Sequence, residues 1–96
     1  MMIIVSYDIS MVDPKGVARL RRISKICLNY GQRVQNSVFE CIVDNQTFIL
    51  LKNHILKEMD NKKDSVRFYI LGNKYEGKIE HYGTKKVLDL DDLLLI

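Results

Sequence analysis

The sequence predicts a small α+β domain in which two helices lie on one face of an antiparallel sheet. The chain has 96 residues, which is enough for one domain, and its 47% hydrophobic and 28% charged residues are typical of a folded globular protein. Short β-branched runs are separated by segments in which apolar residues recur every three or four positions. These alternating periodicities predict strands and helices in the order β-α-β-β-α-β.

The first predicted strand, residues 3–9, is a short apolar run rich in β-branched residues. Asp8 interrupts this run. A charge there is costly unless it is paired, hydrogen-bonded or bound to a metal. Asp8 is therefore either a cap for the residues that follow or an oxygen ligand of a divalent cation.

Residues 15–30 form the first predicted helix, and Gly31 is a favourable residue for its end. Residues 32–43 are strand-like, either as one strand or as two strands joined at Asn36-Ser37. The polar pair favours the bend. The expected buried stripe of the helix consists of Val17, Leu20, Ile23, Cys27 and Tyr30.

A second helix is predicted from an Asp44-Asn45 cap to about Met59. Residues 65–71 alternate in the manner of a strand, and residues 78–82 are predicted to form a fifth, short strand.

Together these elements predict a ferredoxin-like β-α-β-β-α-β domain with an extra C-terminal strand. Its core covers about residues 1–72. One face of the sheet is left bare, and a twofold copy of the chain is the usual cover for such a face. We expect residues 73–96, which end in an acidic, leucine-rich tail, to pack on that dimer partner.

The composition narrows the class of protein. The net charge of +3 permits a polyanionic partner without requiring one. Cys27 and Cys41 lack the spacing of a zinc or redox motif and are expected to be buried small hydrophobes. The chain shows no basic leader and no apolar stretch of membrane-spanning length, so we expect a cytoplasmic protein with no membrane partner.

Three segments carry a resemblance to a known family: Val5-Ser6-Tyr7-Asp8-Ile9, the run from Gly31 to Cys41 (Gly-Gln-Arg-Val-Gln-Asn-Ser-Val-Phe-Glu-Cys), and Arg67-Phe68-Tyr69-Ile70-Leu71-Gly72. Over essentially its whole length the chain resembles the small CRISPR-associated adaptation nuclease, the second-numbered Cas protein. The resemblance implies a ferredoxin-like homodimer with Mg²⁺- or Mn²⁺-dependent endonuclease activity on RNA or double-stranded DNA. It also implies that the dimer bridges CRISPR integrase subunits during spacer acquisition.

The resemblance places the catalytic, metal-binding aspartate of the family on Asp8. It assigns nucleic-acid contacts to Arg19, Arg21, Arg33 and Ser37, and a role in the site to Phe39. From the residues alone, Arg22 and Lys25 extend the basic helix face, although such a face is often only solvated. Ser37 and Phe39 also fit a structural bend and an interface side chain, with Tyr7 and Phe39 as positioning or interface residues.

One carboxylate holds Mg²⁺ weakly, so the site needs a second Asp8 across a twofold axis. A metal held there would lower the pKa of a bound water and stabilise charge on the scissile phosphate. His54 and His81 are expected to be packing or surface residues. Asp89, Asp91 and Asp92 alternate with leucines, and we expect them to belong to a tail that docks on a partner protein rather than to bind a metal.

Three functions remain open at this point. The first is a metal-dependent endonuclease, and the second is a non-catalytic DNA-binding bridge within the integrase complex. The third, less favoured, is a toxin-type ribonuclease. An RNA-recognition module is disfavoured because its aromatic motif is absent.

Overall fold

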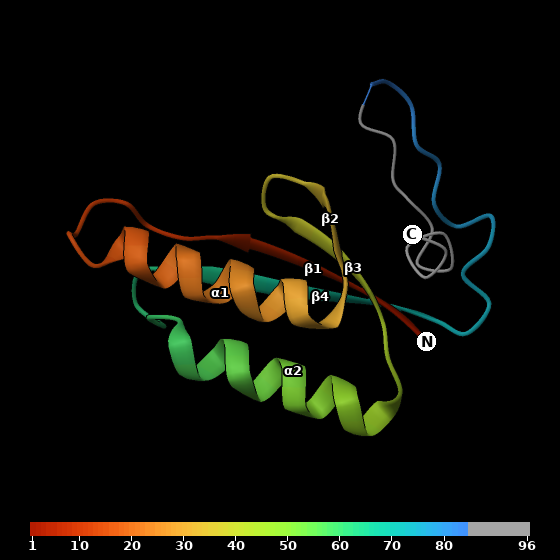
Figure 1. Cartoon of the computed structure of the whole chain (residues 1–96), viewed down its shortest axis with the longest axis horizontal. Coiled ribbons are helices and arrows are strands. Elements are labelled where there is room, and N and C mark those ends of the chain that lie inside the picture. Colours follow the sequence, from red (N-terminus) through yellow and green to blue (C-terminus); the bar gives the residue numbers. More distant parts are fainter. Residues whose placement is uncertain (85–96) are drawn as a thin grey trace.

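The structure is a computed structural model, and it describes residues 1–84. Two helices cover one face of a four-stranded antiparallel sheet with the strand order β2-β3-β1-β4 (Figure 1). This arrangement confirms the predicted α+β class and the β-α-β-β-α-β order. The elements are β1 (Met2–Asp8), α1 (Gly16–Tyr30), β2 (Gln32–Gln35), β3 (Val38–Ile42), α2 (Asn45–Glu58) and β4 (Ser65–Gly72).

The two faces of the sheet follow from the alternation of side chains along β1. Ile3, Val5 and Tyr7 are buried beneath the helices. Ser6 and Asp8 point to the opposite face, which no element of residues 1–84 covers. We call this the open face.

The core lies between the sheet and the helices. Ile23 and Cys27 of α1 and Leu51 and Ile55 of α2 are fully buried there. Both cysteines are free and buried, as predicted. Val17, in contrast, was wrongly predicted to belong to the buried stripe, because the first turn of α1 turns Gly16 toward the Ser10 carbonyl and leaves Val17 exposed.

The predicted helix boundaries are confirmed, and each has a local cause. The Asp44 carboxylate accepts a hydrogen bond from the Thr47 backbone N–H at 2.7 Å and caps α2. Gly31 ends α1 in an extended conformation, with φ −166° and ψ −156°. A Cβ atom at Gly31 would lie 2.1 Å from the Glu40 carbonyl oxygen, so the close approach of β3 requires glycine here.

The segment from residue 32 to residue 43 contains two strands, which confirms the predicted bend. β2 and β3 pair as a hairpin whose turn contains Asn36 and Ser37. Arg33 Nη1 donates to the Asn36 carbonyl oxygen at 2.9 Å, and the Tyr7 backbone N–H donates to the Ser37 carbonyl oxygen at 3.1 Å. The second bond fixes the turn against the end of β1.

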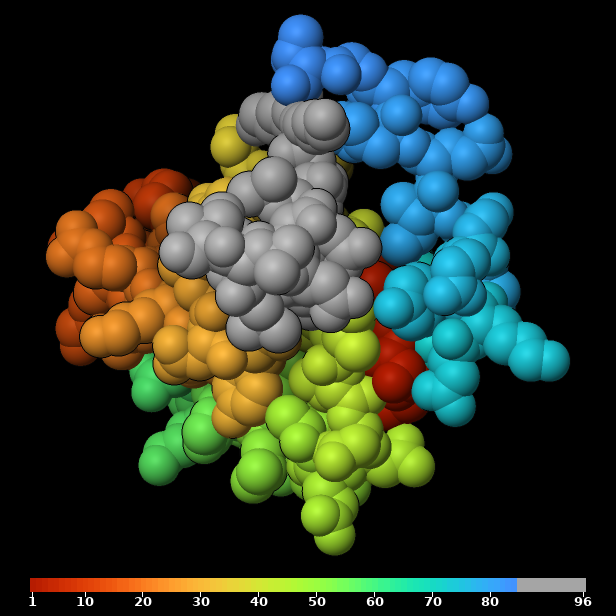
Figure 2. Space-filling view, turned by 45° about the vertical axis from the view of Figure 1, so that its right-hand side comes forward, coloured from red at the N-terminus to blue at the C-terminus, as the bar shows by residue number. Residues whose placement is uncertain are grey.

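The prediction of a strand at residues 78–82 is wrong for the single chain. After Gly72, where φ is +80°, residues 73–84 leave the sheet, and those from 76 onward are exposed. A strand needs a hydrogen-bonded neighbour, and the segment has none among residues 1–84. Residues 78–84 form part of an arm that projects from the body of the domain (Figure 2).

The predicted tail at residues 87–96 lies outside the described residues. Within residues 1–84, no helix is both long enough and apolar enough to cross a membrane.

Candidate functional site

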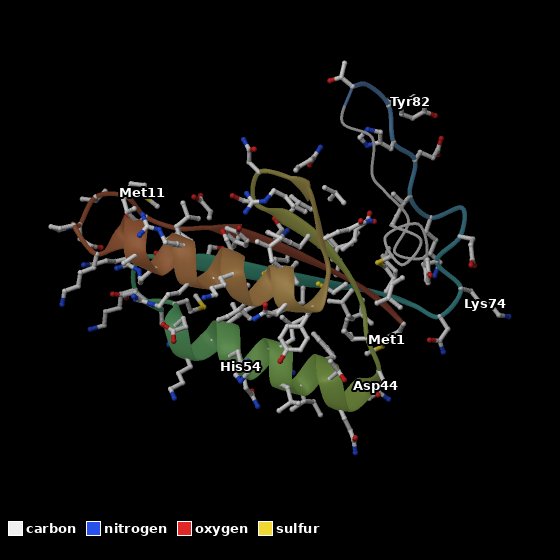
Figure 3. The ribbon with its side chains drawn as sticks, in the orientation of Figure 1. Met1, Met11, Asp44, His54, Lys74 and Tyr82 are labelled. Carbon is white, nitrogen blue, oxygen red and sulfur yellow. The ribbon has the colours of Figure 1, made fainter. Side chains whose placement is uncertain are left out.

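Asp8 is the last residue of β1 and is exposed on the open face. Its neighbour on β4 is Ser65, because the two strands are paired in antiparallel register. This end of the molecule is marked in Figure 3 by Met11, on the connection after β1, whereas Met1 and Asp44 lie at the opposite end. Asp8 therefore presents its carboxylate to the solvent at the end of a central strand.

A shallow hollow of about 160 Å³ surrounds Asp8 on the open face. Its lining comes from neighbouring segments of β1 and β4: Ser6, Tyr7, Asp8, Ser65, Arg67 and Tyr69. Within it, Arg67 Nη1 donates to the Tyr69 hydroxyl at 3.1 Å, and the guanidinium carbon lies 5.8 Å from the Tyr69 ring centroid. One face of the sheet thus carries a carboxylate, two serine hydroxyls and an arginine.

Arg67 and Tyr69 were not among the residues predicted for the site. The alternation of residues 65–71 in the sequence predicts that both lie on the same face of their strand. The alternation does not reveal which strand lies beside them in the sheet. The pairing of Ser6 with Arg67 brings these residues next to Asp8.

The described residues of a single chain do not supply a complete metal site. Among residues 1–84, no group of three or more histidine, cysteine, aspartate or glutamate side chains is placed to hold an ion. Asp8 offers one carboxylate, and Mg²⁺ bound by proteins generally requires further anionic oxygens. The donor set fits such an ion only if a second chain or a substrate phosphate completes it.

Tyr7 and Phe39, predicted to be positioning or interface residues, lie in the core and not on the open face. Phe39 is fully buried, and its ring stacks on Tyr7 with the centroids 6.1 Å apart. The Tyr7 hydroxyl shares a 2.6 Å hydrogen bond with Ser24 Oγ of α1, and burial raises the Tyr7 pKa. Both side chains support β1 from beneath, immediately before Asp8.

Arg19 is buried in an ion-pair cluster rather than exposed for phosphate binding. The side chain was expected to bind phosphate, but it is only 8% exposed and pairs with two carboxylates of its own chain. Its Nη2 lies 2.9 Å from Asp13 Oδ2, and its Nε lies 2.7 Å from Asp64 Oδ2. The guanidinium donors are therefore occupied, and Arg19 has a structural role.

The two carboxylates around Arg19 are held in the ionised form. Burial alone would raise the pKa of Asp64, but hydrogen bonds from Arg19 and from the Asp60 and Ser10 backbone amides outweigh it and lower the pKa. The Arg19 guanidinium also lowers the pKa of Asp13 well below its usual range. The cluster therefore depends on these carboxylates remaining charged.

The other predicted basic residues do not gather around Asp8. Arg21, Arg22 and Lys25 are exposed on α1, which covers the opposite side of the sheet. Arg22 pairs with Glu58 at 2.8 Å. Arg33 lies on the helix side of the edge strand β2, with its guanidinium carbon 4.9 Å from the Phe39 ring centroid.

Ser37 belongs to a second, larger hollow of about 650 Å³. This hollow lies between the β2–β3 turn and residues 81–84 of the arm. It contains His81, while His54 is exposed on α2. The structure therefore brings neither histidine into the hollow around Asp8.

Comparisons with known proteins agree with this geometry. Residues 1–79 match the family model described as CRISPR associated protein Cas2. The chain is 50% identical over 96 residues to the CRISPR-associated endoribonuclease Cas2 of Chlorobaculum tepidum, covering 100% of both chains. It is 48% identical over 95 residues to the CRISPR-associated endonuclease Cas2 of Halalkalibacterium halodurans, covering 99% of each.

The fold is shared with solved structures as well. A crystal structure of Streptococcus pyogenes Cas2 at pH 6.5 superposes with a TM-score of 0.76 at 46% identity, covering 86% of this chain and all of that one. A match at this identity reflects common ancestry as well as a common fold. Sequence and structure agree, and the chain belongs to the CRISPR associated protein Cas2 family.

Proposed function

We propose that this chain forms a homodimeric, metal-dependent endonuclease that acts in CRISPR adaptation, with the Asp8 side chains of two copies at its centre. The relatives named as endoribonuclease or endonuclease support the nuclease role. The observation that carries the proposal is the exposed carboxylate of Asp8 on a face that residues 1–84 leave uncovered.

The open face has the character of a surface that binds a second copy. Ile42 and Tyr69 are 42% and 44% exposed there. Between them on β1 lie Met2, which pairs with Ile42, and the half-buried Ile4, which pairs with Tyr69. Contiguous apolar residues of this kind mark association surfaces. A twofold axis near the hollow would cover them and bring the two Asp8 carboxylates toward each other.

In such a dimer the two Asp8 carboxylates together supply oxygen ligands that the described residues of one chain do not provide. Mg²⁺ or Mn²⁺, when bound, would supply a water of lowered pKa and neutralise charge on the scissile phosphate. The protein itself holds the carboxylates on rigid β1 strands, which the stacked Tyr7 and Phe39 rings fix from below. Basic residues then bind the phosphates of double-stranded DNA or RNA without reading the sequence.

The basic residues form a surface suited to a long polyanion. Arg21, Lys25 and Arg33 are exposed on the helix side, and a twofold axis doubles them. Such a dimer would also serve to bridge CRISPR integrase subunits.

One observation favours a second candidate function, a DNA-binding bridge without hydrolysis. Among the described residues of a single chain, no three histidine, cysteine, aspartate or glutamate side chains are placed to hold a metal ion. Neither His54 nor His81 lines the hollow around Asp8. Binding and bridging need the dimer and the basic surface but not the Asp8 carboxylates. The role of Asp8 separates the two functions.

The test compares the wild type with Asp8→Asn, which keeps the shape of the side chain, and with the control Glu76→Gln, which removes an exposed charge from the turn after β4. Sedimentation first establishes that all three are folded dimers. Labelled double-stranded DNA and single-stranded RNA are then incubated with Mg²⁺, with Mn²⁺ or with a chelator.

Metal-dependent cleavage by the wild type and by Glu76→Gln, together with its loss in Asp8→Asn, is the expected result. The substrate that is cut identifies the preferred nucleic acid. If all three dimers bind DNA and none cuts, or all cut equally, the Asp8 nuclease is rejected and the bridge is favoured.

A further inference from the structure

We infer that Arg67 is a phosphate-binding residue of the Asp8 site and that Tyr69 orients it. The inference rests on the proposed function, because it requires nucleic acid to reach the open face. It goes beyond that function by adding a cationic partner to the carboxylate and by naming its ligand, a non-bridging oxygen of the phosphodiester backbone.

The register between β1 and β4 places Arg67 close to Asp8. Asp8 pairs with Ser65 and Ser6 pairs with Arg67, so Arg67 is the diagonal neighbour of Asp8 on the same face. Diagonal neighbours in an antiparallel pair lie roughly 7–8 Å apart at their Cα atoms, within reach of a long side chain. A phosphate between the two residues could contact Arg67 while its reacting atom faces Asp8.

The Arg67 guanidinium is oriented and still has donors available for a ligand. Arg67 is exposed, and no carboxylate among residues 1–84 pairs with it. One of its nitrogens donates to the Tyr69 hydroxyl at 3.1 Å, which fixes its orientation and leaves the other donors available. A planar guanidinium held in this way is suited to a bidentate contact with phosphate oxygens.

Comparison with the other arginines strengthens the assignment. Arg19 is fully engaged by carboxylates of its own chain, and Arg22 pairs with Glu58. Arg21 and Arg33 lie on the helix side of the sheet. Of the arginines in the described part of the chain, Arg67 alone shares a hollow with Asp8.

The hollow itself is of a suitable size and chemistry. Its volume of about 160 Å³ is enough for a phosphate group with a few waters, since one water occupies roughly 30 Å³ in the liquid. The hydroxyls of Ser6 and Ser65 offer further donors beside the guanidinium.

A competing role for Arg67 is an ion pair across the proposed dimer. Glu40 lies on the open face, opposite Ile4 on the neighbouring strand, and partial burial raises its pKa. A second copy could bring its own Glu40 toward Arg67. Phosphate binding and cross-dimer pairing make different predictions for DNA affinity and for dimer stability.

The experiment measures duplex binding in the full-length Asp8→Asn background, so that no cutting occurs. Fluorescence anisotropy of a labelled DNA duplex gives the Kd over a range of salt concentrations for Arg67→Ala, Arg67→Lys and Tyr69→Phe. Lys57→Ala is the control, because it removes one exposed positive charge on α2, on the helix side of the sheet. Sedimentation gives the dimer dissociation constant of each protein.

We expect Arg67→Ala to raise the Kd by roughly tenfold or more and to lower the slope of log K against log salt by about one per lost phosphate contact. Arg67→Lys retains part of the affinity through its charge, and Tyr69→Phe shows a smaller loss because the guanidinium is no longer oriented. The control leaves affinity within about twofold of the background, as expected for an exposed lysine that contacts no phosphate.

The inference is overturned if the Kd and salt slope of Arg67→Ala match those of Lys57→Ala. It is also overturned if Arg67→Ala weakens the dimer while the DNA affinity per dimer is unchanged, which would assign Arg67 to the interface. Cleavage assays with the native Asp8 separate this inference from the proposed nuclease. If the wild type and Arg67→Ala cleave equally, only the role of Arg67 is rejected. If Arg67→Ala loses DNA affinity but the wild type cleaves no substrate, only the nuclease is rejected.

Discussion

Arg19 and Asp64, 45 residues apart in the chain, meet in the interior through two hydrogen bonds. Arg19 Nε donates to Asp64 Oδ2 at 2.7 Å, and Nη2 donates to Oδ1 at 3.2 Å. The same carboxylate accepts the backbone amides of Ser10 and Asp60 at 3.0 Å and 2.9 Å. One buried ion pair thereby joins the connection after β1, the helix α1 and the connection before β4.

This ion pair lies close to the candidate site. Ser10 is two residues after Asp8, and Asp64 directly precedes Ser65, the β4 neighbour of Asp8. The pair therefore fixes both segments that lead to the carboxylate. Its loss is expected to affect the site through the fold rather than through direct contact with nucleic acid.

The first prediction concerns the stability of this ion pair. Arg19→Ala leaves Asp64 buried without its cationic partner, and an uncompensated buried charge is strongly destabilising. We expect the Tm to fall by at least about 10 °C. Arg22→Ala is the control, because its pair with Glu58 is exposed and its loss should lower the Tm by a few degrees at most. Equal shifts in thermal unfolding would contradict the structural role of Arg19.

The second prediction concerns acid. Asp13 and Asp64 have lowered pKa values in the folded protein, so they favour folding while ionised. Their contribution is complete above the unfolded value near 3.8 and is lost as the pH falls through the lower folded values. Urea unfolding at about pH 7 and about pH 3 should therefore show a loss of unfolding free energy.

Asp64→Asn should reduce this pH dependence, because the amide does not titrate and only the contribution of Asp13 remains. The variant is less stable at neutral pH, and only its change with pH tests the prediction. Glu76→Gln, on the exposed turn after β4, should retain the wild-type pH dependence. If Asp64→Asn keeps the same dependence, the acid sensitivity has another source.

The third prediction concerns Gly31. Its Cβ position lies 2.1 Å from the Glu40 carbonyl oxygen and 2.7 Å from Cys41 Sγ, so alanine forces β3 and α1 apart. Overpacking of this kind costs about 1–3 kcal/mol, and a backbone clash places Gly31→Ala at the upper end or beyond. Denaturant unfolding measures the loss. Asn29→Ala, at an exposed position of α1, should change stability little, and a neutral Gly31→Ala would refute the close packing.

The fourth prediction concerns thiol reactivity. Burial raises the pKa of Cys27 to about 12 and that of Cys41 to about 11, so neither is a thiolate near neutral pH. A disulfide reagent such as Ellman's reagent should therefore leave the native protein unmodified. Both thiols should react after unfolding in guanidinium chloride. Rapid reaction of either cysteine in the native state would contradict its burial.

The sequence by itself determined the order of the elements and singled out Asp8 as a candidate site residue. Helical and strand periodicities are local properties of the chain, so the two helices and the strands could be predicted from neighbouring residues. The charge of Asp8 was visible because it interrupts an apolar run. Even the bend at Asn36-Ser37 followed from local turn chemistry.

Only the tertiary structure decided how the charged residues are used. Arg19 resembles the exposed arginines beside it, and nothing local reveals that Asp13 and Asp64 occupy its donors. Arg67 lies beside Asp8 because of the register between β1 and β4, and residues 78–82 form no strand because no described segment pairs with them. Ion pairs, register and strand pairing join residues far apart in the chain, so they are fixed when the chain packs and not by the local pattern.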